Sequence, residues 1–215
     1  MAYYHPTEEM LLAYATGAQN AATSLLVACH LTYCPQCRKS TAFFDAVGGA
    51  LLEQGMPSEI EDSDGVLVRV RVPAPPAGAT AHAELVDDDM ILPRPLRLLT
   101  GCAAANLPWR RIITGISEVP LDFGGGAQAR LMRIQPDHGI PRHTHEGTEA
   151  TLVLDGAFSD AAGHYECGDV ALADGTVDHR PIADPGPACI CLAVTDAPLR
   201  FTGILGRVAA FFGKT

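Results

Sequence analysis

GIPRHTHEGTEATLVLDG, residues 139–156, places two histidines two positions apart and a glutamate four positions after the second. Side chains two residues apart on a β-strand point to the same face, so His143 and His145 are expected to face one side. Glu149 can return to that side across a turn. A barrel interior lined in this way could hold one divalent ion.

A further ligand for such an ion has to come from another strand. GDVALADGTVDHRP, residues 168–181, offers His179 next to a glycine-containing turn. The pattern therefore predicts one metal site in this half of the chain, with ligands His143, His145, Glu149 and His179. The alternative is that these histidines are exposed turn residues beside a strand.

Short β-rich runs separated by turn residues surround this motif. From Trp109 onward they read ARLMRIQ, TLVLDG, GDVALA, ACICLAV and LRFTGI. Such spacing is typical of an all-β sandwich or barrel. Cys189 and Cys191 alternate along one of these runs, and we expect both to be buried.

The first quarter of the chain, residues 7–54, has a helical pattern instead. One helix is predicted after the N-cap residue Thr7, a second over about residues 21–33, and a third from Pro35 to about residue 54.

The segment between the helical and β-rich parts is harder to interpret. Residues 58–72 are ambiguous, because an acidic stretch typical of a helix start precedes the strand-like alternation VLVRVRV. Residues 73–95 contain five prolines and are predicted to be a linker.

A second cluster of ligand residues lies where the second and third predicted helices meet, in HLTYCPQC, residues 30–37. His30 and Cys34 lie four residues apart at a helix end, and Cys37 follows one turn into the next helix, so the three can face one point. A structural Zn²⁺ usually takes four N or S ligands, and His5 is the nearest further histidine. We therefore predict a zinc site formed by His5, His30, Cys34 and Cys37.

Other interpretations of this cluster remain open. C-x-x-C can be a redox dithiol, although thioredoxin-like sites follow a strand and here helices are predicted on both sides. The histidine could instead cap a helix while the cysteines are buried as apolar residues. Cys29 competes as a ligand, but it points about 100° away from His30 around the helix and is expected in the core.

Composition narrows the class of protein. Of the 215 residues, 47% are hydrophobic and 19% are charged, as in an ordinary globular protein. No apolar run is long enough to span a membrane and no secretory signal is evident, so a cytoplasmic location without membrane contact is expected. The net charge of −10 argues against direct binding to nucleic acid and would suit a basic protein partner.

Both clusters resemble motifs of known families. The spacing H-x-H-x₃-E-x₆-G from His143 to Gly156 resembles the first cupin motif, and the segment that ends at His179 resembles the second. A histidine near the N-terminus, 24 intervening residues and H-x₃-C-x₂-C resemble the zinc-binding anti-sigma domain. Together with PWRR, DAVGG and CICLAVTDAPLRF, the chain resembles the ChrR-type cupin anti-sigma factors over nearly its whole length.

This resemblance implies a two-domain organisation. An all-α zinc-binding anti-sigma domain would span residues 1–72, a proline-rich linker residues 73–95, and an all-β cupin jelly-roll barrel residues 96–215. The helical domain would hold an extracytoplasmic-function sigma factor inactive. The cupin domain, with a divalent metal such as Zn²⁺, would govern release under oxidative stress from singlet oxygen or organic peroxides.

A regulator of this kind is expected to be no enzyme. The alternative is a metal-dependent cupin enzyme, of the dioxygenase or isomerase type, fused to a zinc-stabilised docking domain. Three histidines and one glutamate match the metal ligands of many such enzymes, and fold alone does not decide between the two functions.

Overall fold

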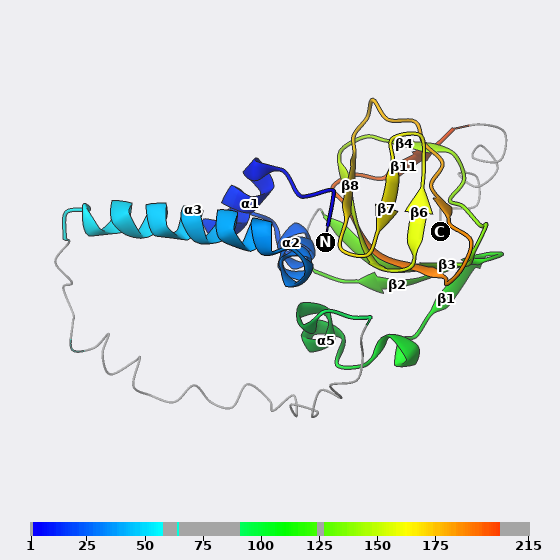
Figure 1. Ribbon diagram of the computed structural model, residues 1–215, viewed down its shortest axis with the longest axis horizontal. Helices are drawn as coiled ribbons and strands as arrows, with labels where there is room; N and C mark the ends of the chain where they lie inside the picture. Colours follow the sequence, from blue (N-terminus) through cyan, green and yellow to red (C-terminus); the bar gives the residue numbers. More distant parts are fainter. Residues whose placement is uncertain (1, 58–63, 65–90, 124–126, 203–215) are drawn as a thin grey trace.

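The computed structural model describes residues 2–57, 64, 91–123 and 127–202, which form a group of helices followed by an antiparallel β-barrel (Figure 1). The predicted fold class, an all-α part followed by an all-β part, is therefore confirmed. The ambiguous segment 58–72, apart from Asp64, and most of the predicted linker lie outside the described residues.

Three helices follow the predicted order: α1 (Glu8–Ala15), α2 (Ala21–Tyr33) and α3 (Pro35–Glu53). The Thr7 side chain caps α1 by accepting a hydrogen bond from the backbone N–H of Met10. Cys34 both ends α2 and caps α3, because its sulfur accepts the backbone N–H of Cys37 at 3.3 Å. The junction of α2 and α3 is thus a sharp turn built on the predicted ligand residues.

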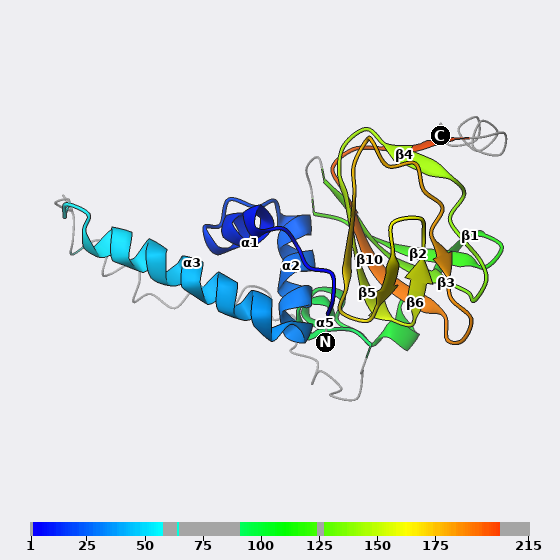
Figure 2. The same cartoon turned by 45° about the horizontal axis from the view of Figure 1, so that its top comes forward.

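The barrel consists of one large sheet and two small ones, in which all strand pairs are antiparallel. The large sheet has the order β1 (Arg110–Ile113), β2 (Ile116–Leu121), β3 (Gln128–Ile134), β10 (Cys189–Thr195), β5 (Glu149–Asp155) and β8 (Val170–Ala173). The other side of the barrel is formed by β7 (His164–Glu166), β6 (Ala157–Ser159) and β9 (Ile182–Ala183), and by β11 (Leu199–Phe201) paired with β4 (His143–His145) (Figure 2).

Both faces of the large sheet are covered by other parts of the protein. Every residue of the central strand β10 is buried. Cys189 and Cys191 point into the barrel interior, as expected, whereas Leu192 lies in a second core with Leu26 of α2. This burial on two faces explains why ACICLAV is continuously apolar instead of alternating.

A helix that the sequence reasoning missed completes this second core. Helix α5 (Arg94–Thr100) packs against α2 and is followed by the 3₁₀ helix η1 (Ala104–Asn106), which leads into β1. Leu96 of α5 is fully buried in the same cluster as Leu26 and Cys29. Helix α5 crosses residue 95, where the predicted linker ends, and it connects the helices with the barrel.

The third helix is less buried than the other two. Figures 1 and 2 show α3 projecting away from the barrel, with its first turns beside α1 and α2. Only Cys37 and Thr41 are buried on it. None of the helices in the described part of the chain is long and apolar enough to cross a membrane.

Candidate metal centres

The four predicted ligands of the helical part lie together. The ligand atoms of His5, His30, Cys34 and Cys37 are all within 4.8 Å of one another. His5 Nδ1 is 3.5 Å from the sulfur of each cysteine, and His30 Nε2 is 3.3 Å from Cys37 Sγ. Zn–N bonds of about 2.0–2.1 Å and Zn–S bonds of about 2.3 Å in a tetrahedron separate N and S by roughly 3.5 Å. These spacings therefore fit a tetrahedral N₂S₂ metal site.

The surroundings of this cluster favour neutral groups unless a cation is present. Burial lowers the pKa of His30, which keeps its imidazole neutral and able to bind a metal. Burial also raises the pKa of the Cys37 thiol to about 12, and the neighbouring Cys34 adds to that rise. A bound divalent ion would lower the pKa of the Cys37 thiol again, because it stabilises the thiolate.

The four predicted ligands of the barrel also converge, with ligand atoms within 4.8 Å of one another. His143 and His145 lie on β4, Glu149 begins β5, and His179 lies in the loop between β8 and β9, bridged to the backbone of His143. All four side chains are buried. Two neighbouring strands and one later loop thus supply a compact set of donors.

Hydrogen bonds on the far side of two of these rings fix where their protons lie. His143 Nδ1 lies 2.9 Å from the carbonyl oxygen of Pro141, and His179 Nδ1 lies 2.7 Å from the carboxylate of Asp160. Both Nδ1 atoms therefore donate, which leaves a lone pair on each Nε2. These two Nε2 atoms face each other at 3.2 Å, and His145 Nε2 lies 3.2 Å from that of His179.

Lone pairs that face each other at this distance repel unless a cation lies between them. A proton can serve only two of the three nitrogens, whereas a metal ion serves all three and the carboxylate as well. Nitrogens at about 2.0–2.1 Å from a tetrahedral Zn²⁺ lie roughly 3.3 Å apart. The donor set therefore fits a divalent metal.

Burial favours the neutral forms of the ligand side chains in the barrel cluster, as it does in the helical cluster. It lowers the pKa of His143 to about 4 and, less strongly, the pKa of His145, so both rings are neutral ligands near pH 7. Burial raises the pKa of Glu149, which disfavours a lone carboxylate there. A cation bound at the cluster would offset this cost.

Asp160 is a functional candidate that the sequence reasoning missed. Its side chain is 3% exposed and orients the ring of His179, while its other oxygen accepts the backbone N–H groups of Ala162 and Gly163. Nothing in the sequence pattern connects Asp160 with His179, because the two meet only through the barrel topology.

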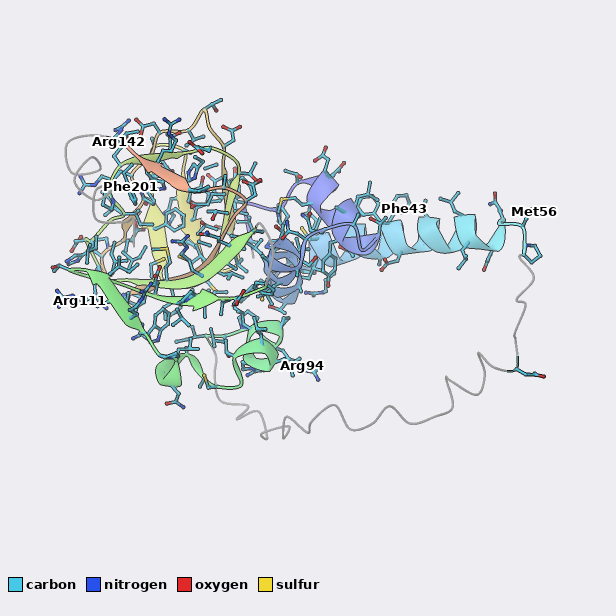
Figure 3. The ribbon with its side chains drawn as sticks, turned by 180° about the vertical axis from the view of Figure 1, so that it is seen from behind. Phe43, Met56, Arg94, Arg111, Arg142 and Phe201 are labelled. Carbon is cyan, nitrogen blue, oxygen red and sulfur yellow. The ribbon has the colours of Figure 1, made fainter. Side chains whose placement is uncertain are left out.

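A mostly apolar cavity of about 350 Å³ adjoins the cluster inside the barrel. Glu149 and His179 form part of its wall together with apolar side chains such as Met132, Phe158 and Phe201. Figure 3 shows Phe201 at the β11 edge of the barrel. The cavity has room for a small molecule beside the metal ligands.

Several other cysteine, histidine and glutamate residues lie outside both clusters. Cys29 is completely buried in the core, Glu146 is exposed, and His164 is exposed on β7. His138 is half-buried in the loop after β3. His82 lies outside the described residues.

A third feature is an apolar surface on α3. All residues from Asp45 to Pro57 are exposed, and the large apolar ones with exposed side chains on this helix and just beyond it are Phe43, Val47, Leu51, Leu52 and Met56. Phe43, Val47 and Leu51 are four residues apart and so lie along one side of the helix, and we call these three residues the α3 apolar face. Figure 3 shows Phe43 on the projecting helix beside α1, and Met56 just beyond the far end of this helix.

The fold and the two clusters define a class of protein: a helical domain with an N₂S₂ metal-ligand set, joined to a cupin barrel with three histidines and a glutamate. A family model described as "ChrR Cupin-like domain" matches residues 99–198. The anti-sigma-E factor ChrR of Cereibacter sphaeroides is 37% identical, over 97% of both chains. This chain belongs to the ChrR family of anti-sigma factors.

One solved structure with substantial sequence identity agrees with this assignment. The crystal structure of Rhodobacter sphaeroides SigE in complex with the anti-sigma ChrR matches with a TM-score of 0.77 and 38% identity. The match covers 91% of this chain and 100% of the matched chain. An RmlC-like cupin protein from Ralstonia eutropha has a TM-score of 0.40 and 20% identity over 48% of this chain and 73% of its own.

Proposed function

We propose that this protein is an anti-sigma factor that binds and inhibits an extracytoplasmic-function sigma factor. The observation that carries the proposal is the α3 apolar face. Similarity to ChrR supports the nature of the partner, because ChrR is named an anti-sigma-E factor and was crystallised with SigE.

The physical argument begins with the helix itself. Residues 45–57 have no buried side chain among the described residues, and α3 contains Gly48 and Gly49. Isolated helices shorter than about 12–15 residues are marginal in water, so a projecting helical segment gains stability from a partner. A row of exposed apolar side chains on such a helix is typical of docking into a partner's groove.

The first two helices offer little exposed apolar surface for such a contact. The apolar residues Leu26 and Val27 of α2 are fully buried, because the helix is packed between the barrel, α5 and α1. On α1, Leu12 is exposed. We therefore assign most of the sigma-binding surface to α3, with a contribution from α1.

Charge supports a protein partner. The chain has a net charge of −10, which favours association with a basic protein and disfavours direct contact with nucleic acid. We propose a cytoplasmic location, where such a partner would be met.

We propose that Zn²⁺ is held by His5, His30, Cys34 and Cys37. When bound, the ion cross-links the N-terminal segment to the α2–α3 junction and so fixes the direction in which α3 projects. The chain itself presents the donors: the Cys34 cap holds the Cys37 backbone, and the buried imidazole of His30 is neutral and needs no proton to be removed.

We propose that His143, His145, Glu149 and His179 hold a second divalent ion, with Zn²⁺ as the first candidate. The adjoining cavity would admit a small oxidant to the ligands. Histidine and thiol oxidation changes coordination, so we propose that the cupin part controls release under oxidative stress from singlet oxygen or organic peroxides.

The family supports this binding role over catalysis by a cupin dioxygenase or isomerase, because its named members act on sigma factors. The test is co-purification of the full chain with candidate extracytoplasmic-function sigma factors, with metal counting on the complex. We expect a stable complex that contains zinc and blocks transcription. A zinc-loaded chain that retains none of the sigma factors of its own genome would refute the proposal.

A further inference from the structure

One turn of the barrel lies directly against the helical metal cluster. It connects β7 with β8 and contains Cys167, Gly168 and Asp169. The carbonyl oxygen of Gly168 lies 2.8 Å from His30 Nδ1, inside the buried interface between α2 and the barrel. His30 Nδ1–H therefore donates a hydrogen bond to the Gly168 carbonyl of the barrel, and the Nε2 lone pair of His30 faces Cys37 Sγ.

The conformation of this turn depends on glycine. Gly168 has a φ of +95°, and a Cβ built there would lie 3.0 Å from Cβ of Tyr33 on α2. Glycine therefore allows the close approach that brings this carbonyl oxygen to His30. A larger residue would have a strained backbone at this φ, and its Cβ would crowd Tyr33.

The same turn also holds the segment that carries His5. The buried carboxylate of Asp169 accepts the backbone N–H groups of Tyr3 and Tyr4, and the backbone N–H of Val170 donates to the carbonyl oxygen of Tyr4 at 3.1 Å. Asp169 also accepts the N–H of Glu166 at 3.0 Å, so it closes the turn itself. The residue directly before His5 is therefore fixed to the barrel.

The four ligands of the helical cluster accordingly fall into two pairs. Cys34 and Cys37 are placed by the α2–α3 junction, through the hydrogen bond between them. His30 is oriented from outside the helical part by the carbonyl of Gly168, and the backbone directly before His5 is held there by Asp169. The barrel thus positions both nitrogen donors, while the helices position both sulfur donors.

We propose that the Gly168–Asp169 turn of the cupin domain completes the zinc site of the helical domain, so that zinc affinity depends on docking of the two domains. This inference rests on the proposed zinc site. Groups that hydrogen-bond to metal-binding histidines fix the tautomer and the ring orientation, and their loss typically lowers metal affinity about 10–100-fold. Linkage requires the converse, because zinc must strengthen docking by the same factor.

The test measures metal affinity in the full chain. Co²⁺ is the probe, because thiolate-to-cobalt absorption reports only the cluster that contains cysteines, and Zn²⁺ is then titrated to displace it. We expect Asp169→Asn to weaken Zn²⁺ binding about tenfold, at the lower end of the roughly 10–100-fold range, because Asp169 holds the backbone before His5 and not a ring nitrogen. The control is Asp184→Asn, because Asp184 accepts a hydrogen bond from Ser159 within the barrel and its loss should leave the affinity unchanged.

Two failures can be told apart. A wild-type chain that gives no thiolate-to-cobalt absorption refutes the zinc site itself and with it this inference. Normal absorption with equal Zn²⁺ affinity in the wild type and in Asp169→Asn refutes only the role of the turn.

A second measurement covers the case in which Asp169→Asn does not fold. In the Cys37→Ser chain, which keeps the turn intact, hydrogen exchange of the Tyr4 and Val170 amides should accelerate relative to the zinc-loaded wild type. Exchange within β3 should remain the same and serves as the control. Unchanged exchange at Tyr4 and Val170 after zinc loss would overturn the proposed dependence.

Discussion

Replacing Leu51 by alanine tests the assignment of α3 as the sigma-binding element. Full burial of a leucine side chain contributes about 1.5–3 kcal/mol. Leu51 is 66% exposed in the free protein, so about two thirds of that contribution is still available to a partner. Leu51→Ala should therefore cost about 1–2 kcal/mol of binding, which is roughly a 5- to 30-fold rise in Kd.

Leu51→Ala should leave the stability of the free protein almost unchanged. Leu51 contacts no buried core, and alanine is at least as good a helix former as leucine. We expect thermal unfolding of the free chain to stay within about 0.5 kcal/mol of the wild type, as for most surface substitutions. Weaker binding would then reflect a lost contact and not a damaged domain.

The assay is calorimetric titration with the purified sigma factor, together with inhibition of transcription in vitro. Leu98→Ala is the matched control, because Leu98 is 53% exposed on α5, away from the α3 apolar face. Wild-type affinity for Leu51→Ala would refute the reasoning. Equal weakening by Leu98→Ala would show that any exposed leucine has this effect and would refute it as well.

Four further changes test other parts of the structure. Cys37→Ser should remove one zinc and destabilise the helical domain, since metal binding adds on the order of 10 kcal/mol to small zinc domains; metal counting and calorimetry check this. Leu96→Ala should cost about 2–5 kcal/mol and lower the unfolding midpoint of both domains together in a calorimetric scan. Glu149→Gln should lower the metal content of the barrel and abolish release from the sigma factor under oxidative stress, while inhibition persists in a transcription assay. Asp160→Asn should weaken metal binding by the barrel about 10–100-fold in a chelator competition, although Asp160 is no ligand itself.

Both ligand sets could be predicted because each is largely local in sequence. HLTYCPQC brings three donors together within one helical junction, and HTHEGTE brings three together within one strand and the turn after it. His5 and His179 come from farther away, and the structure brings each of them to the predicted cluster. Whether these clusters hold the expected metals stays a prediction.

The features that could not be predicted from the sequence depend on contacts between distant segments. Helix α5 lies partly in a proline-rich stretch that looks like a linker, yet Pro95 suits the first turn of a helix and Leu96 finds a core built by α2 and β10. The roles of Gly168 and Asp160 also arise only once the barrel has folded. Periodicity describes each segment separately and contains no information on these pairings.

The direct packing of the helices against the barrel bears on how the proposed control by the cupin part would reach the sigma-binding surface. A flexible linker alone would let the barrel act at a distance, but the N-terminal segment joins both metal clusters physically. The ring of Tyr4 lies against Tyr165, with centroids 4.6 Å apart, and a Cβ on Gly163 would lie 2.6 Å from its hydroxyl. Gly163 belongs to the loop whose backbone holds Asp160, which orients His179. A change of coordination at His179 therefore has a short route of packed groups to the residue before His5, and so to the helix that carries the proposed sigma-binding surface.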